Sequence, residues 1–146
     1  MRGLVLAVLS ATTLAVPAAF AAPEEDMPRQ AAMAARFQPF DAVTGSDWTA
    51  AFPYPFFRAA AEGESDSVSL VMKPGAYKVV VLCNCEKVDV ALKAPDGSVP
   101  APDRSNDQGA MYSLDVPADG EFEVSTTLRA CQEAHCDFAV KAYRKK

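Results

Sequence analysis

The stretch from Ser67 to Lys93 constrains the fold most strongly, because it holds three short apolar segments separated by a Pro-Gly turn and a Cys-Asn-Cys turn. Residues 68–72 and 88–93 alternate between apolar and polar, as strands with one buried face do. Residues 77–83 are β-branched and almost wholly apolar, which predicts a central strand. A glycine after a proline supplies the positive φ of a tight turn. The stretch therefore predicts consecutive antiparallel strands.

Further downstream the same pattern recurs. Residues 111–116, 122–128 and 138–143 alternate in the same way and are separated by Pro-, Gly- and Asp-rich turns. No strong helical pattern lies among them, and residues 94–110 read as a long irregular connection. We therefore expect an all-β fold, an antiparallel β-sandwich resembling a jelly roll.

The first residues of the chain read as a secretory signal peptide. Arg2 supplies the positive charge, residues 4–16 are apolar, and Ala19-Phe20-Ala21 fits a cleavage site before Ala22. An uncleaved anchor is the alternative, but a span needs about 20 apolar residues. We expect a signal peptide over residues 1–21 and an exported protein, periplasmic or secreted, with no membrane span in its mature chain.

Residues 22–58 are expected to form an N-terminal arm, and residues 59–146 the sandwich domain. Helix-forming residues over 27–37 predict either one short helix or a frayed lead to the arm, and prolines keep much of the remainder irregular. The arm carries seven of the chain's thirteen aromatic residues. They either close a core against the sheet or form an exposed patch for a glycan or an envelope protein. The candidate contact residues for such a patch are Trp48, Phe52, Tyr54 and Phe56.

An even number of cysteines in an exported chain predicts two disulfides. Each pair ends its own hairpin, which favours local bonds, Cys83–Cys85 and Cys131–Cys136. Bonds between the two pairs are the alternative, and the chain-entropy model favours them because they close a longer loop.

The same side chains allow a sharper interpretation, in which the protein is a thiol-redox or metal carrier. The four cysteines and the sole histidine, His135, are ligand types that suit zinc or copper. Asp96, Asp103 and Asp107, with Asn106, could hold calcium, although their spacing fits no EF-hand loop. We expect disulfides and solvated turn residues instead, and therefore no cofactor.

Several segments from residue 58 onward have a common order of turns, strands and cysteine pairs: AEGESDSVSL, KPGAY, VDVALKAPDG, LDVPADGEFEV and CQEAHCDFAV. In that order the chain resembles bacterial exported proteins of the pre-peptidase C-terminal (PPC-like) β-sandwich family. The resemblance implies a non-catalytic accessory or binding fold and no particular substrate.

The net charge is −5, and it becomes −6 when Arg2 leaves with the signal peptide. An acidic chain lacks the basic face that a nucleic-acid partner requires. One histidine and no Gly-x-Ser-x-Gly motif give little basis for a hydrolase. We therefore expect a non-catalytic exported module with a binding or structural role.

Overall fold

The computed structural model describes residues 26–146, so the predicted signal peptide lies outside the described residues. Over these residues the elements follow in the order α1 (Asp26–Ala35), α2 (Gln38–Thr44), a 3-10 turn (Gly45–Asp47), β1 (Trp48–Ala50), β2 (Phe56–Ala61), β3 (Ser65–Met72), β4 (Gly75–Cys83), β5 (Lys87–Lys93), β6 (Arg104–Asn106), β7 (Gly109–Val116), β8 (Gly120–Ala130) and β9 (His135–Lys145).

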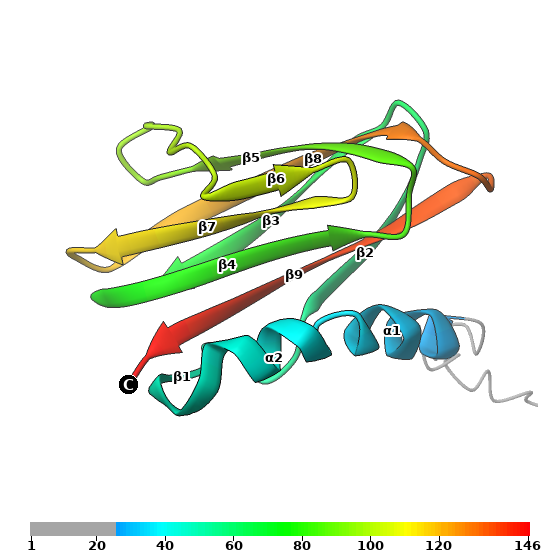
Figure 1. Cartoon of the computed structure of the whole chain (residues 1–146). Coiled ribbons are helices and arrows are strands. Elements are labelled where there is room, and N and C mark those ends of the chain that lie inside the picture. Colours follow the sequence, from blue (N-terminus) through cyan, green and yellow to red (C-terminus); the bar gives the residue numbers. More distant parts are fainter. Residues whose placement is uncertain (1–25) are drawn as a thin grey trace, which may run out of the picture.

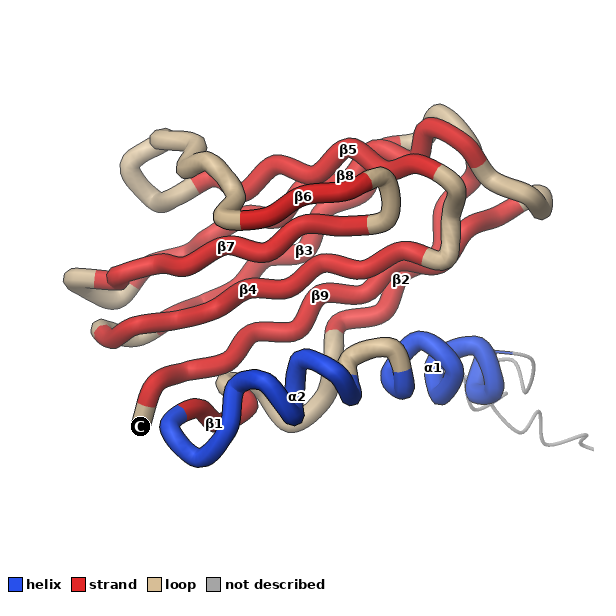
Figure 2. Tube along the Cα trace, viewed as in Figure 1, coloured by secondary structure: helices blue, strands red, loops and turns tan. Residues whose placement is uncertain are grey.

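Two antiparallel sheets face one another, which confirms the predicted all-β sandwich (Figure 1). The larger sheet has the order β1-β9-β4-β7-β6, and β2 pairs with β9 beside β1. The smaller sheet has the order β3-β8-β5. The two helices run along the β9 side of the larger sheet (Figure 2). The larger sheet therefore has an inner face toward the smaller sheet and an outer face partly covered by helices.

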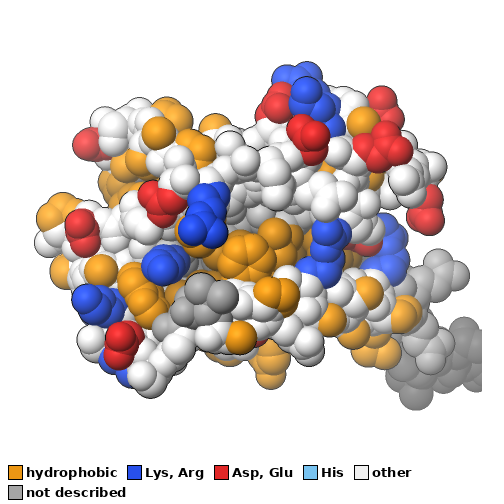
Figure 3. All heavy atoms as spheres, in the orientation of Figure 1, with side chains coloured by type: hydrophobic (Ala, Val, Ile, Leu, Met, Phe, Trp, Pro, Cys, Tyr) orange, Lys and Arg blue, Asp and Glu red, His pale blue; other side chains and the backbone are white. Residues whose placement is uncertain are grey.

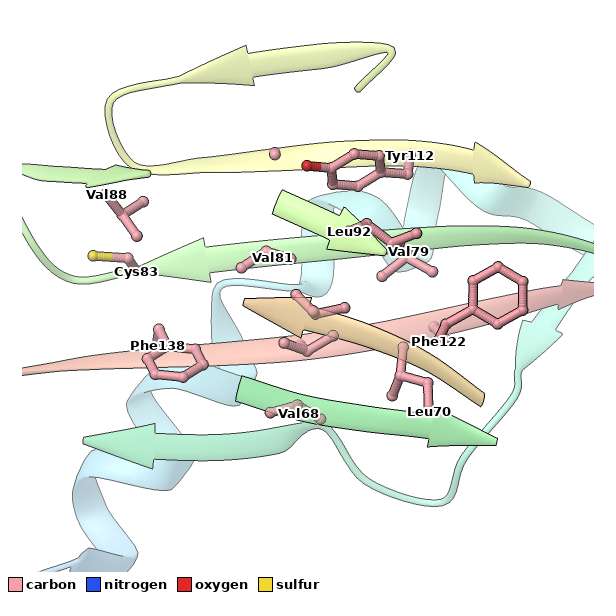
Figure 4. Close-up of a cluster of buried hydrophobic side chains, with 14 of the residues drawn as sticks. Val68, Leu70, Val79, Val81, Cys83, Val88, Leu92, Tyr112, Phe122 and Phe138 are labelled. Carbon is pink, nitrogen blue, oxygen red and sulfur yellow. The ribbon is translucent and has the colours of Figure 1, made fainter. Parts of the chain in front are cut away.

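Alternating side chains of both sheets fill the space between them (Figure 4). Val68 and Leu70 of β3 point toward Val79 and Val81 of β4, and all four are at most 2% exposed. Burial of each such side chain contributes about 1.5–3 kcal/mol. The period-two pattern of the sequence thus specifies the core directly.

The strand β4 lies in the middle of the larger sheet, with β7 on one side and β9 on the other. This confirms the central strand predicted from its apolar sequence. Val79 and Val81 face the smaller sheet, whereas Val80 faces outward and is 2% exposed. Val80 is covered because it packs with Met33 and Phe37 of the arm. A strand that is apolar on both faces therefore indicates a second apolar layer outside the sandwich.

Three strands lie in or extend from segments that were expected to be largely irregular: β1, β2 and β6. The strand β2 crosses the expected boundary between arm and sandwich at residue 58. It forms because β9, eleven residues long, provides backbone hydrogen-bond partners for both β1 and β2. Edge pairing of this kind depends on tertiary context more than on β-propensity.

The helix expected over residues 27–37 is present as α1. The second helix, α2, falls where prolines predicted irregular chain. Pro39 lies in its first turn, where a missing amide hydrogen breaks no helical hydrogen bond. Within residues 26–146, neither helix combines the length and hydrophobicity that crossing a membrane requires.

Candidate functional site: a hollow on the outer face of the larger sheet

The outer face of the larger sheet carries a second apolar cluster. Its buried members are Met33 and Phe37 from the arm, with Val80, Ala139 and Tyr143 from β4 and β9. Phe37 is fully buried, and Phe40, Trp48 and Phe57 pack against the cluster. The arm therefore seals the β9 side of this face.

Polar contacts hold α2 on the sheet. The carboxylate of Asp41 accepts hydrogen bonds from Lys141 Nζ at 2.6 Å and from Tyr143 Oη at 2.7 Å. Burial raises the pKa of the Tyr143 phenol, and the bond to Asp41 raises it further. Burial also acts to raise the pKa of Asp41, but the hydrogen bonds from Lys141 and Tyr143 outweigh it, so that pKa is lowered. The group thus consists of an ionised carboxylate and a protonated phenol.

Beyond α2, the arm leaves the outer face of β4, β7 and β6 open. A hollow of about 780 Å³ lies there, within the size range typical of small-molecule sites. We call it the outer-face hollow; it is lined chiefly by Phe40 of α2, Lys78 and Val80 of β4, Met111 of β7, and Asp103 with Arg104 at β6. Figure 3 shows hydrophobic surface between the helices and the strands of the larger sheet, with Lys and Arg side chains on either side of it.

The strand register explains why these side chains share one face. Val80 pairs with Met111, and Met111 pairs in turn with Arg104 on the next strand. Residues opposite one another in a sheet point to the same side. Lys78 lies two residues before Val80 and therefore also points outward. Val80 and Met111 therefore form an apolar floor, and Lys78 and Arg104 place one positive charge at each of two edges of that floor.

Neither cation has a carboxylate partner among the described residues. Lys78 Nζ lies 4.9 Å from the centre of the Trp48 ring, a cation–π contact. Other basic side chains are paired: Arg29 with Asp137, Lys141 with Asp41, and Arg129 with Asp89. The one acid lining the outer-face hollow is Asp103, whose side chain is exposed.

The cysteines are paired locally, as the sequence favoured. Cys83 is bonded to Cys85 and Cys131 to Cys136, with Cα–Cα distances of 5.2 and 5.7 Å, and no cysteine is free. Cys83, Cys85 and Cys136 are buried at the end of the sandwich where β4 finishes and β9 begins.

The residues considered as alternative metal ligands do not converge. His135 is exposed at the start of β9, and Asp96 accepts hydrogen bonds from the backbone and hydroxyl of Ser98, which lower its pKa. Asp107 lies in the turn between β6 and β7, and Asp103 lines the outer-face hollow. Over residues 26–146, no three of the His, Cys, Asp and Glu side chains are grouped to hold a metal ion.

The four aromatic candidates do not form one exposed patch. Tyr54 is 81% exposed. Phe52 and Phe56 stack edge to face, with ring centroids 5.2 Å apart, and pack against the main core. Trp48 is half-buried beneath Lys78. The arm's aromatics are thus divided between the two apolar clusters, with Tyr54 left outside.

Sequence reasoning missed Lys78, Arg104 and Met111 as lining residues. One signal was available: Lys78 interrupts an otherwise apolar strand, which marks a polar position on a face that is covered elsewhere. Arg104 gave no such signal, because it belongs to a three-residue edge strand inside a polar loop. Neither a protein-family model nor a curated protein matches the chain, so the functional argument rests on the arrangement of its own residues.

Proposed function

We propose that the protein is an exported, non-catalytic binding module whose ligand site is the outer-face hollow. One observation carries the proposal: the arm covers one part of an apolar sheet face, and beside it the face forms an open hollow with a volume of about 780 Å³. Concave, largely apolar sites with a few polar groups are the usual places for small ligands.

The chemistry of the lining supports binding over catalysis. Its residues include one hydroxyl, from Ser105, and neither a histidine nor a cysteine. A nucleophile would need an adjacent base, and Ser105 points with its cross-strand partner Ala110 toward the other face of the sheet. The resemblance to PPC-like modules is a second support. Export is part of the proposal, and the N-terminal sequence pattern and the two cysteine pairs support it.

An uncharged fluorescent probe, N-phenyl-1-naphthylamine, tests whether the outer-face hollow binds apolar molecules. We expect its fluorescence to rise on binding, with a dissociation constant of about 10–100 μM for a ligand of this size. Met111→Trp fills the floor and should weaken binding at least about fivefold. Val71→Trp is the matched control, since Val71 is 69% exposed on β3 of the other sheet.

Arg104→Trp is a second blocking variant at an exposed position, and it covers the case in which Met111→Trp does not fold. Circular dichroism and urea unfolding verify that each variant is folded. The absence of probe binding to the wild-type protein would overturn the proposed site. So would equal binding by the blocked variants and the Val71→Trp control.

A further inference from the structure

We propose that the outer-face hollow takes a small anionic amphiphile, with the anionic group held by Lys78 and Arg104 and the apolar body lying on Met111 and Phe40, which are partly exposed beside the buried Val80. This inference rests on the proposed function, because it names the class of ligand for the same site.

The positions of the two cations make a shared anion feasible. Lys78 and Arg104 are on the outer face of strands separated by β7. Two strand spacings and two residues of rise place their Cα atoms roughly 12 Å apart. Both side chains are long and flexible enough to reach a group between them, provided that the Lys78 ammonium turns from the Trp48 ring of β1 toward β7. Met111 lies on the intervening strand, so its side chain forms the floor under that point.

Charge complementarity decides the sign of the ligand. Lys78 and Arg104 have no carboxylate partner over the described residues, in a chain whose net charge is −5. Asp103 on the same rim leaves an excess of one positive charge around the hollow. A cationic amphiphile would meet this excess positive charge, whereas an anionic one neutralises it.

The polar rim also predicts the orientation of the ligand. Phe40 and Val80 lie toward the arm, where the second apolar cluster begins. Arg104 is exposed and belongs to the edge strand. The anionic group therefore lies toward β6 and the solvent, and the apolar body extends toward α2. Contacts of this exposed kind are worth little individually, so we expect a preference of about fivefold to tenfold for the anion.

A matched pair of probes tests the inference. 8-Anilino-1-naphthalenesulfonate shares the ring system of N-phenyl-1-naphthylamine and adds one sulfonate. We expect the wild-type protein to bind the sulfonate about fivefold to tenfold more tightly than the neutral probe. Added salt should reduce that preference, because exposed charges are screened.

The double variant Lys78→Gln/Arg104→Gln should lose the preference, so that the ratio of its affinities for the two probes falls to about one. The control Lys73→Gln/Lys93→Gln removes two exposed lysines, one in the turn before β4 and one on β5 of the smaller sheet. This control should still prefer the sulfonate probe. Because it changes the net charge by the same amount as the double variant, it shows whether the preference comes from contacts in the hollow or from the net charge of the protein.

The outcomes distinguish this inference from the proposed function. Equal affinity of the wild-type protein for the two probes overturns the anionic class and leaves the binding site standing. Retention of the preference in Lys78→Gln/Arg104→Gln, or its loss in the control, also overturns it. If neither probe binds, the site and the ligand class both fall.

Discussion

The guanidinium of Arg29 in α1 donates two hydrogen bonds to the carboxylate of Asp137 in β9, from Nε to Oδ2 at 3.0 Å and from Nη2 to Oδ1. Asp137 is 3% exposed, and the side-chain amide of Asn84 donates a third hydrogen bond to it. Arg36, the residue that follows α1, donates a hydrogen bond to the carbonyl oxygen of Cys83. These contacts attach the first part of the arm to the disulfide end of the sandwich.

The first prediction concerns this ion pair. Arg29→Ala should lower the free energy of unfolding by about 2 kcal/mol, because it leaves a buried carboxylate short of two donors. Arg58→Ala is the control, because Arg58 Nε lies 3.9 Å from Asp66 Oδ2 and both of these side chains are exposed. That change should cost less than about 0.5 kcal/mol. Urea unfolding measures both, and equal losses would contradict the proposed role of Arg29.

The fold could be predicted from sequence wherever side-chain periodicity alone decides the structure. Residues 68–72 and 88–93 alternate cleanly, and β3 and β5 lie there. β2 could not be predicted, because the alanines that extend it have little β-propensity and pair only because β9 is long enough.

The candidate site was less predictable than the sandwich, for a related reason. The outer-face hollow depends on where the arm stops covering β4, which is a property of tertiary packing. The disulfide pairs, by contrast, followed from local spacing, since Cys131 and Cys136 flank one turn. Packing of the arm's aromatic residues against the sheet was one of two interpretations that the sequence left open, and the sequence does not say that the arm contacts both faces of the larger sheet.

A second prediction concerns the acid stability of α2. The hydrogen bonds from Lys141 and Tyr143 keep the pKa of Asp41 below its usual value despite burial. A carboxyl group whose pKa is lowered on folding stabilises the protein above its unfolded pKa of about 3.9. That stabilisation is lost as the pH falls through the lower, folded pKa. Asp41→Asn should therefore reduce stability near neutral pH and flatten the loss in acid.

Urea unfolding at a series of pH values measures this effect. Asp115→Asn, an exposed aspartate on β7, is the matched control for removing one negative charge. An acid dependence of Asp41→Asn as steep as that of the wild-type protein would show that Asp41 does not contribute in the way described.

A third prediction is the disulfide map of the purified protein. Trypsin cleavage after Lys78 and Lys87 releases Cys83 and Cys85 in one peptide, and cleavage after Arg129 and Lys141 releases Cys131 and Cys136 in another. Local pairing predicts that each peptide is separate and two hydrogens lighter than its reduced form. Peptides linked to one another without reductant would support the cross-linked alternative instead.

The last prediction concerns Gly109, the first residue of β7, which lines the outer-face hollow. A Cβ built at this position would overlap the carbonyl oxygen of Val81 in the neighbouring strand. The obstacle is backbone in a central strand, so a side-chain rotation cannot relieve it. Gly109→Ala should therefore separate the start of β7 from β4 and lower the free energy of unfolding by about 1–3 kcal/mol.

The same change should alter the hollow, because β6 and β7 carry Arg104 and Met111. Binding of the neutral naphthylamine probe should weaken together with stability. Ser105→Ala is the control on the adjoining strand, because Ser105 is exposed and alanine is smaller than serine. This change should alter the free energy of unfolding by less than about 0.5 kcal/mol. Wild-type stability and probe affinity in Gly109→Ala would mean that β7 does not approach β4 as closely as the structure places it.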